Sequence, residues 1–162
     1  MIFNYFLGLG SNIEPRLNYI TNAATELRQS GEIIRKSSIY ESEAWGYKKQ
    51  SKFLNAVIQF QSDLEPNELL RIIKIIEINA GRSLSKINWG PREIDIDILF
   101  ADGINIQENN LEIPHKYFHK RKFVLLPMAE INSGYIVENN SIEYYLNKCK
   151  DSLTVKRVKS IW

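Results

Sequence analysis

The chain has 162 residues, of which 44% are hydrophobic and 25% are charged. These proportions are typical of a folded globular protein and exclude a disordered or membrane-embedded chain. Its 21 basic residues are balanced by 19 acidic ones, for a net charge of +2, so overall charge does not favour nucleic acid or an anionic membrane as a partner.

Cysteine usage and the N-terminal segment indicate the compartment. Cys149 is the single cysteine, which excludes an internal disulfide and is typical of a reducing environment. Residues 1–12 lack the basic start and long apolar run of a signal peptide. No stretch approaches the roughly 18 consecutive apolar residues of a membrane span. We therefore expect a cytoplasmic monomer with a single domain over residues 1–162 and no membrane or nucleic-acid partner.

The chain begins with a strand pattern followed by a helix pattern. Residues 2–8 are rich in aromatic and β-branched residues and predict a strand, which the glycines of residues 8–12 are expected to break in a tight turn. A dinucleotide-binding fingerprint is rejected because Ile13 occupies the third glycine position. Pro15 is typical of a first helical turn and Gly31 of a helix end. The apolar face of this helix consists of Leu17, Ile20, Ala24 and Leu27.

The middle of the chain continues with strands and a second helix. Residues 32–40 and 53–61 predict strands, separated by a polar loop over residues 41–51. Phe53 and Asn55 share the face of the second strand opposite its apolar side. They are either a ring-binding pair or a partly covered phenylalanine beside a solvated asparagine, and the spacing favours neither.

Residues 66–80 predict the second helix, with a core stripe of Leu69, Leu70, Ile73 and Ile76. Lys74 and Glu77 lie outside this stripe and are expected to form a surface ion pair. Gly81 is expected to end the helix.

Residues 94–98 alternate strictly between isoleucine and aspartate, which predicts a strand. Asp95 and Asp97 then point to the same side, with Cα atoms roughly 6.5–7 Å apart. Two carboxylates are too costly to bury unpaired, so this face must meet water or cations. Upstream, Trp89 supplies a flat ring and Arg92 a guanidinium group. Carboxylates for Mg²⁺ and an arginine for phosphate indicate a nucleotide site, and the alternative is a solvated strand face.

The last third of the chain adds further elements. Residues 111–115 are expected to be extended because a proline disfavours helix at the preceding residue. His115 and His119 have helical spacing, but the absence of a third ligand argues against zinc. A helix carrying Phe123, a short helix capped by Ser141 and a strand over residues 153–158 complete the chain. The order predicts an α+β fold with a ferredoxin-like split βαβ core, in which helices pack on a mainly antiparallel sheet.

Several ordered motifs together resemble a known family. They are Leu7-Gly8-Leu9-Gly10-Ser11-Asn12, Tyr40-Glu41-Ser42, Trp45-Gly46, Phe53-Leu54-Asn55-Ala56, Gly81-Arg82, Trp89-Gly90-Pro91-Arg92-Glu93-Ile94-Asp95-Ile96-Asp97, Pro114-His115 and Arg121-Lys122-Phe123-Val124-Leu125-Leu126-Pro127. They cover most of the chain, which resembles the 6-hydroxymethyl-7,8-dihydropterin pyrophosphokinases of folate biosynthesis. The resemblance implies transfer of a pyrophosphoryl group from ATP to the hydroxymethyl oxygen of the pterin, with release of AMP.

The resemblance also implies the chemical roles of the charged residues. Asp95 and Asp97 would hold two Mg²⁺ ions along the triphosphate. Arg92 and Arg121 would neutralise charge on the transferred group, with Arg82 and His115 assisting from the flanks. No protein nucleophile is expected, because phosphoryl transfer depends mainly on positioning and charge stabilisation. Asp97 is also a candidate acceptor for the proton of the substrate hydroxyl.

Further residues are implied for the two substrates. Phe53 and Phe123 would stack on the pterin and Asn55 would hydrogen-bond it. The remaining pterin contacts would be Ser42, Glu43, Trp45 and Trp89, and the ATP contacts would be Lys74, Glu77, Trp89, Arg92, Ile98, His115 and Arg121. The loops over residues 41–51 and 82–88 are expected to close over the substrates. Departures from the family pattern include Leu84 and Asn88 in place of arginines, and Lys116-Tyr117 after His115 in place of Pro-Arg.

Two other readings are compatible with parts of this pattern. One is a Mg²⁺-dependent nucleotidyl or phosphoryl transferase that uses another flat acceptor. The second is a non-catalytic RNA-binding module, because ferredoxin-like sheets also bind RNA through surface aromatic residues. An RNP1-type run is absent, and an acidic pair would repel a phosphate backbone in the absence of metal.

Overall fold

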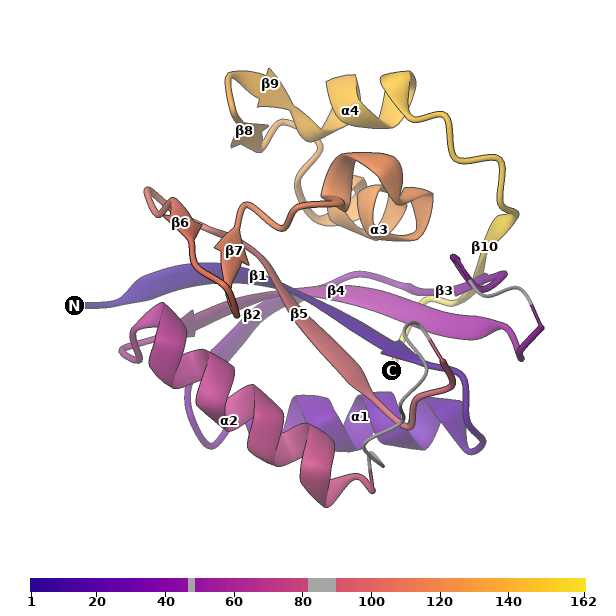
Figure 1. Cartoon of the computed structure of the whole chain (residues 1–162), viewed down its shortest axis with the longest axis horizontal. Helices are drawn as coiled ribbons and strands as arrows, with labels where there is room; N and C mark the ends of the chain where they lie inside the picture. Colours follow the sequence, from indigo (N-terminus) through magenta and orange to yellow (C-terminus); the bar gives the residue numbers. More distant parts are fainter. Residues whose placement is uncertain (47–48, 82–89) are drawn as a thin grey trace.

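A six-stranded antiparallel sheet forms the centre of the protein (Figure 1). The computed structural model describes residues 1–46, 49–81 and 90–162. The strand order is β10-β3-β4-β1-β5, and β2 also pairs with β4. The strands of this sheet are β1 (Phe3–Ser11), β2 (Glu32–Lys36), β3 (Ile39–Ser42), β4 (Phe53–Ser62), β5 (Asp95–Ala101) and β10 (Val155–Lys159).

Helices cover both faces of the sheet, with α1 and α2 below it and α3 and α4 above it in Figure 1. Two small hairpins, β6–β7 and β8–β9, lie outside it. The helices are α1 (Arg16–Leu27), α2 (Pro66–Asn79), the 3-10 turn η1 (Phe118–Lys120), α3 (Lys122–Asn132) and α4 (Ile142–Lys148), and the hairpin strands are β6 (Ile106–Gln107), β7 (Glu112–Ile113), β8 (Ile136–Val137) and β9 (Asn140–Ser141). The predicted ferredoxin-like α+β fold is confirmed, with one predicted strand divided in two.

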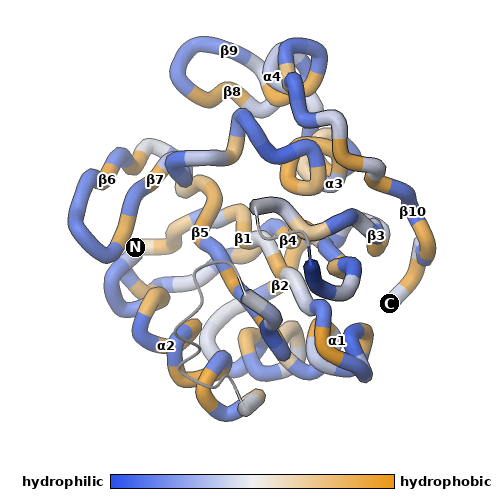
Figure 2. The backbone as a smooth tube through the Cα atoms, turned by 45° about the vertical axis from the view of Figure 1, so that its right-hand side comes forward, coloured by the Kyte–Doolittle hydropathy of each residue, from blue (hydrophilic) through white to orange (hydrophobic). Residues whose placement is uncertain are grey.

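The sheet separates two hydrophobic cores. The larger core lies against α1 and α2, whose hydrophobic and hydrophilic residues alternate along the tube in Figure 2. The second core lies against α3 and includes Phe100, Leu125 and Met128, all at most 2% exposed. The predicted apolar stripes of the first two helices therefore mark real buried faces. Among the described residues, none of the helices has the length and hydrophobicity needed to cross a bilayer.

The first strand is longer than predicted. It does not break at Gly8 but continues through Gly10 to Ser11, because β4 pairs with it on one side and β5 on the other. Hydrogen bonding from both neighbours outweighs the weak intrinsic strand preference of glycine. Gly31 is also misassigned, because it lies beyond the end of α1 and a Cβ atom there would lie 2.2 Å from the carbonyl oxygen of Gln61.

The predicted strand over residues 32–40 is divided into β2 and β3 by Ser37 and Ser38, which are both buried. Ser37 Oγ accepts a hydrogen bond from the N–H of Val57 at 2.9 Å. Ser38 donates its N–H and its hydroxyl group to the carboxylate of Glu130 on α3. These bonds satisfy buried polar groups at the break and fix α3 against the sheet.

Two predicted helix boundaries are confirmed by specific contacts. Gly81 follows α2 with φ +95°, a left-handed conformation that favours glycine. Ser141 Oγ accepts the N–H of Tyr144 at 3.1 Å and caps α4.

Candidate active site

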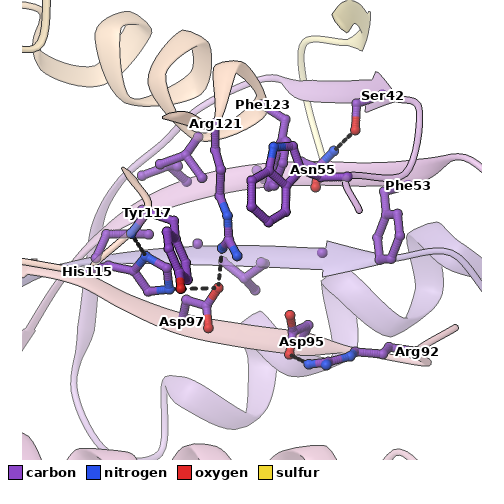
Figure 3. Close-up of a pocket in the computed structure, with 18 of the residues that line it drawn as sticks. Ser42, Phe53, Asn55, Arg92, Asp95, Asp97, His115, Tyr117, Arg121 and Phe123 are labelled. Atoms are coloured by element: carbon purple, nitrogen blue, oxygen red, sulfur yellow. Dashed lines mark hydrogen bonds and ion pairs between the residues drawn. The ribbon is translucent and has the colours of Figure 1, made fainter. Parts of the chain in front are cut away.

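A cavity of about 300 Å³ lies between the sheet and the start of α3 (Figure 3). Four strands, the segment after β7 and α3 all contribute to its walls. The predicted site residues that line it are Ser42, Glu43, Trp45, Phe53, Asn55, Arg92, Asp95, Asp97, His115, Arg121 and Phe123. Residues far apart in the sequence therefore meet at one place.

The two aspartates of β5 point into this cavity from the same face of the strand, as predicted. Asp95 pairs in register with Gly10 of β1, and Asp97 pairs with Gly8. Cross-strand partners share a face of the sheet, so the two glycines lie beside the two carboxylates. Their missing side chains leave the floor of the cavity open, because a Cβ atom on Gly10 would lie 3.4 Å from Asn55 Oδ1.

Each aspartate has an arginine beside it. Arg92 Nη1 donates to Asp95 Oδ1 at 2.5 Å, and Arg121 Nη1 lies 3.6 Å from Asp97 Oδ2. Burial and the negative charge of Asp95 raise the pKa of Asp97, whereas Arg121 opposes this shift. The raised pKa shows that the ionised form of Asp97 is disfavoured in the unliganded protein.

Arg121 is surrounded by aromatic rings and is only 9% exposed. Its guanidinium carbon lies 4.9 Å from the ring centroid of Trp45, 5.5 Å from that of Tyr117 and 5.8 Å from that of Phe123. Stacking of this kind is typical of arginine and fixes the plane of the guanidinium group. The buried Nε atom has no hydrogen-bond partner among the residues that the structure describes.

His115 lies on the side of Asp97 away from Phe53 (Figure 3), with Nε2 at 3.9 Å from Asp97 Oδ2. Burial and the charge of Arg121 lower the pKa of His115 to about 4. Its Nδ1 accepts the N–H of Tyr117 at 3.2 Å, so the proton of the neutral ring resides on Nε2. His115 is therefore uncharged at neutral pH and contributes an N–H donor to the site, and its assistance to the arginines, which the family resemblance implies, stays a prediction.

The other end of the cavity is formed by aromatic rings and an oriented amide group. Asn55 is 5% exposed and donates from Nδ2 to Ser42 Oγ at 2.9 Å. Phe53 lies beside it and Phe123 faces it from α3 (Figure 3). Asn55 is buried at a cavity wall and is therefore not the solvated asparagine of the alternative interpretation, while ring binding by Phe53 and Asn55 stays a prediction.

A second cavity of about 270 Å³ adjoins the first and shares Asp97, His115 and Tyr117 with it. Lys74 and Ile98, two of the predicted ATP contacts, line this second cavity. Asp97 thus lies at the junction of the two cavities, whereas Asp95 lines the first one.

Glu77 is buried, which corrects the prediction of a surface ion pair. Its side chain is 1% exposed, and Oε1 accepts the N–H of Ile96 at 3.0 Å. Oε2 lies 2.9 Å from Nζ of Lys74, which is 53% exposed. Glu77 therefore holds the backbone of β5 between the two aspartates. Its predicted direct contact with ATP stays a prediction, and the burial of its side chain does not favour that contact.

Replacing Glu77 with alanine is expected to lower the free energy of unfolding by about 1–3 kcal/mol, because the buried N–H of Ile96 loses this acceptor. Urea unfolding measures the change. Arg71→Ala, at an exposed position of the same helix, is the matched control and should change the free energy of unfolding by at most about 0.5 kcal/mol. Equal losses in the two variants would contradict the assignment.

Some predicted features lie outside the described residues, and one residue of the site was missed. The predicted features outside the described residues are Arg82, Trp89, the loop over residues 82–88 and part of the loop over residues 41–51. Tyr117, which stacks with Trp45 at 5.9 Å between ring centroids, was noted only as a departure from the family pattern. No periodicity marks it, because it precedes the irregular turn η1.

The chemistry of the donor set fits Mg²⁺. No group of three or more histidine, cysteine or acidic side chains suited to a metal occurs among the described residues. Mg²⁺ is usually held by only one or two carboxylates together with phosphate oxygens and water. Asp95 and Asp97, with side chains 29% and 37% exposed at the cavity, meet this requirement.

Comparison with known proteins gives one consistent result. Residues 6–133 match the family model described as 7,8-dihydro-6-hydroxymethylpterin-pyrophosphokinase (HPPK). The 2-amino-4-hydroxy-6-hydroxymethyldihydropteridine pyrophosphokinase of Aquifex aeolicus is 44% identical over 81% of this chain and 81% of its own length. The protein of the same name from Bacillus subtilis is 40% identical over 78% of this chain and 76% of its own.

Solved structures agree at the level of the fold. A Plasmodium falciparum HPPK-DHPS structure with pterin and p-hydroxybenzoate superposes with a TM-score of 0.71 at 20% identity, over 91% of this chain. A second, with pteroate, gives a TM-score of 0.68 at 19% identity. This chain spans 43% of the length of each of those chains.

Proposed function

Because the chain belongs to the 7,8-dihydro-6-hydroxymethylpterin-pyrophosphokinase family, we propose that the cavity between the sheet and α3 is its active site. The chain is an ATP-dependent pyrophosphokinase of folate biosynthesis, and its substrates are ATP and the hydroxymethyl dihydropterin. The observation that carries the proposal is the alignment of Asp95 and Asp97 on one face of β5, between Arg92 and Arg121.

Asp95 and Asp97 would hold Mg²⁺ through their carboxylates when ATP is present. Such a metal would supply positive charge to neutralise the phosphate oxygens. The adjoining cavity with Lys74 and Ile98 takes the nucleoside end of ATP, so the triphosphate passes Asp97 at the junction of the two cavities and reaches Asp95 in the first one. Glu77 keeps β5 in register by holding the N–H of Ile96.

Arg92 and Arg121 stabilise negative charge on the transferred group. Both guanidinium groups lie beside the carboxylates before ATP arrives, so little reorganisation is needed in the transition state. His115 adds a neutral N–H donor on the nucleotide side. Asp97, next to the reacting oxygens, remains a candidate to accept the proton of the pterin hydroxyl.

The pterin occupies the aromatic end of the cavity. Phe53 and Phe123 provide apolar faces for a flat ring, and Asn55, oriented by Ser42, provides hydrogen bonds along its edge. Glu43 and Trp45 complete the wall on the β3–β4 loop, and Trp45 also covers Arg121. This arrangement directs the hydroxymethyl group of the pterin toward the carboxylates.

The product of ATP tests the reaction directly. With ATP, Mg²⁺ and the hydroxymethyl dihydropterin, the protein is expected to form AMP and the pterin diphosphate in equal amounts, measured by anion-exchange chromatography. Formation of ADP would mean that the acceptor attacks the terminal phosphorus and would overturn the assigned reaction. A reaction without the pterin is the control for simple ATP hydrolysis.

We also propose that the protein acts as a cytoplasmic monomer without nucleic-acid or membrane partners. The single Cys149 and the nearly balanced charge support this proposal. Size-exclusion chromatography with light scattering measures the oligomeric state.

A further inference from the structure

Asn12 occupies a junction that the pyrophosphoryl transfer chemistry does not explain. It follows the last residue of β1, the central strand that pairs with β4 and β5 on its two sides. The residues just before β4 and just before β5 therefore flank it. Asn12 is 4% exposed, so each of its polar atoms needs a partner within the protein.

On the β5 side, Asn12 is bonded twice to Arg92. Its N–H donates to the carbonyl oxygen of Arg92 at 3.1 Å, and its Oδ1 accepts the N–H of Arg92 at 2.8 Å. The side chain of Arg92 then reaches Asp95 at 2.5 Å. One asparagine thus fixes the backbone from which a proposed catalytic guanidinium group extends.

On the β4 side, the same amide group is bonded to the end of the β3–β4 loop. Asn12 Nδ2 donates to Gln50 Oε1 at 3.0 Å and to the carbonyl oxygen of Ser51 at 3.1 Å. This loop carries Trp45, and Phe53 follows it at the start of β4, and both line the active-site cavity.

The partners fix the chemical identity of the side chain. A backbone N–H can only donate and a backbone carbonyl can only accept, so the position requires an acceptor toward Arg92 and a donor toward Ser51. The short side chain of asparagine supplies both the acceptor and the donor. Aspartate lacks the donor, and alanine lacks both groups.

We propose that Asn12 is a positioning residue that holds Arg92 and the β3–β4 loop at a fixed separation. The inference rests on the proposed role of Arg92. Through its side-chain oxygen Oδ1, Asn12 sets the position of Arg92 relative to the transferred group. Through its amide nitrogen it sets the position of the wall that receives the pterin.

A double-mutant cycle tests the link to Arg92. Asn12→Ala is expected to lower kcat by roughly tenfold to a hundredfold, the cost of misplacing a reacting group by about 1 Å. Arg92→Ala should then cost much less in the Asn12→Ala background than in the wild type, because the guanidinium group is already displaced. Fully additive effects would overturn the inference, and wild-type activity in Arg92→Ala would overturn both it and the role of Arg92.

Asn4→Ala is the matched control for this cycle. Asn4 also lies on β1, where its amide group bonds to Asp102 and to Gln59, but it does not line the cavity. Its effect should be additive with that of Arg92→Ala. Coupling as strong as that of Asn12 would mean that any lost amide on β1 disturbs Arg92, and would overturn the specific assignment.

Asn12→Asp separates the contact with Arg92 from the contact with Ser51, and it replaces Asn12→Ala in the test if Asn12→Ala does not fold. It keeps the acceptor for the N–H of Arg92 but places a carboxylate oxygen against the carbonyl of Ser51. The KM for the pterin is expected to rise while kcat stays close to the wild-type value. A fall in kcat with an unchanged KM would overturn the division of roles. Circular dichroism and thermal unfolding establish that each variant is folded.

Discussion

Asp97→Asn is expected to lower kcat by roughly a thousandfold or more, equivalent to about 4 kcal/mol of transition-state stabilisation, and to make the unliganded protein more stable. The two effects have the same origin. Asp97 and Asp95 face one cavity, where burial and the charge of Asp95 disfavour the ionised form of Asp97 in the absence of cations. Asparagine keeps the shape of the side chain and removes the charge.

The gain in stability depends on pH in a defined direction. The pKa of Asp97 is raised above its ordinary value of 3.8 by burial and by Asp95, so the native state retains a proton that the unfolded chain has already lost. Wild-type stability therefore falls as pH rises from about 4 through the native pKa. The advantage of Asp97→Asn should be absent below pH about 4 and should grow as the pH approaches the native pKa.

Thermal unfolding in a chelating buffer without ATP measures this difference, and AMP formation measures turnover. Asp95→Asn should also lose turnover but gain no stability, because Asp95 is paired with Arg92 at 2.5 Å. Asp63→Asn, an exposed carboxylate, is the control and should change neither quantity. Retained turnover in Asp97→Asn would contradict the assignment of the metal site.

Local sequence patterns predicted the elements whose own residues determine them. The alternation of Ile94, Asp95, Ile96 and Asp97 identified both the strand and the face that carries the carboxylates, because side chains of a strand alternate with period two. Ser141 and Gly81 marked helix ends because capping depends on a few neighbouring backbone groups. The ferredoxin-like order followed from the sequence of these elements.

The features that the sequence did not reveal depend on partners distant in the chain. β1 continues through Gly8 and Gly10 because two neighbouring strands hold it. Glu77 is buried because the N–H of Ile96 provides a partner 19 residues away. The junction at Asn12 connects residues separated by 39 and 80 positions. Helical or strand periodicity does not encode such contacts.

Arg121→Ala is expected to lower kcat by roughly a hundredfold to a thousandfold, the usual cost of removing a preorganised donor from a site that stabilises developing negative charge. The guanidinium group is buried among Trp45, Tyr117 and Phe123, with Nη1 at 3.6 Å from Asp97 Oδ2. It is therefore oriented before the substrates bind. Its removal also leaves the two carboxylates without this positive charge, so the midpoint of thermal unfolding should fall.

Three further variants separate charge from geometry. Arg121→Lys keeps the positive charge but lacks the planar fork that binds phosphate through two bonds and stacks on the rings, so it should recover much of the stability and little of kcat. Adding Asp97→Asn to Arg121→Ala should restore the unfolding midpoint but not the turnover, because the excess negative charge is gone while the donor is still missing. Arg71→Ala, an exposed arginine on α2, is the matched control and should leave both unchanged. Full activity in Arg121→Lys would show that charge alone suffices, and that the aromatic stacking around Arg121 serves the fold more than the reaction.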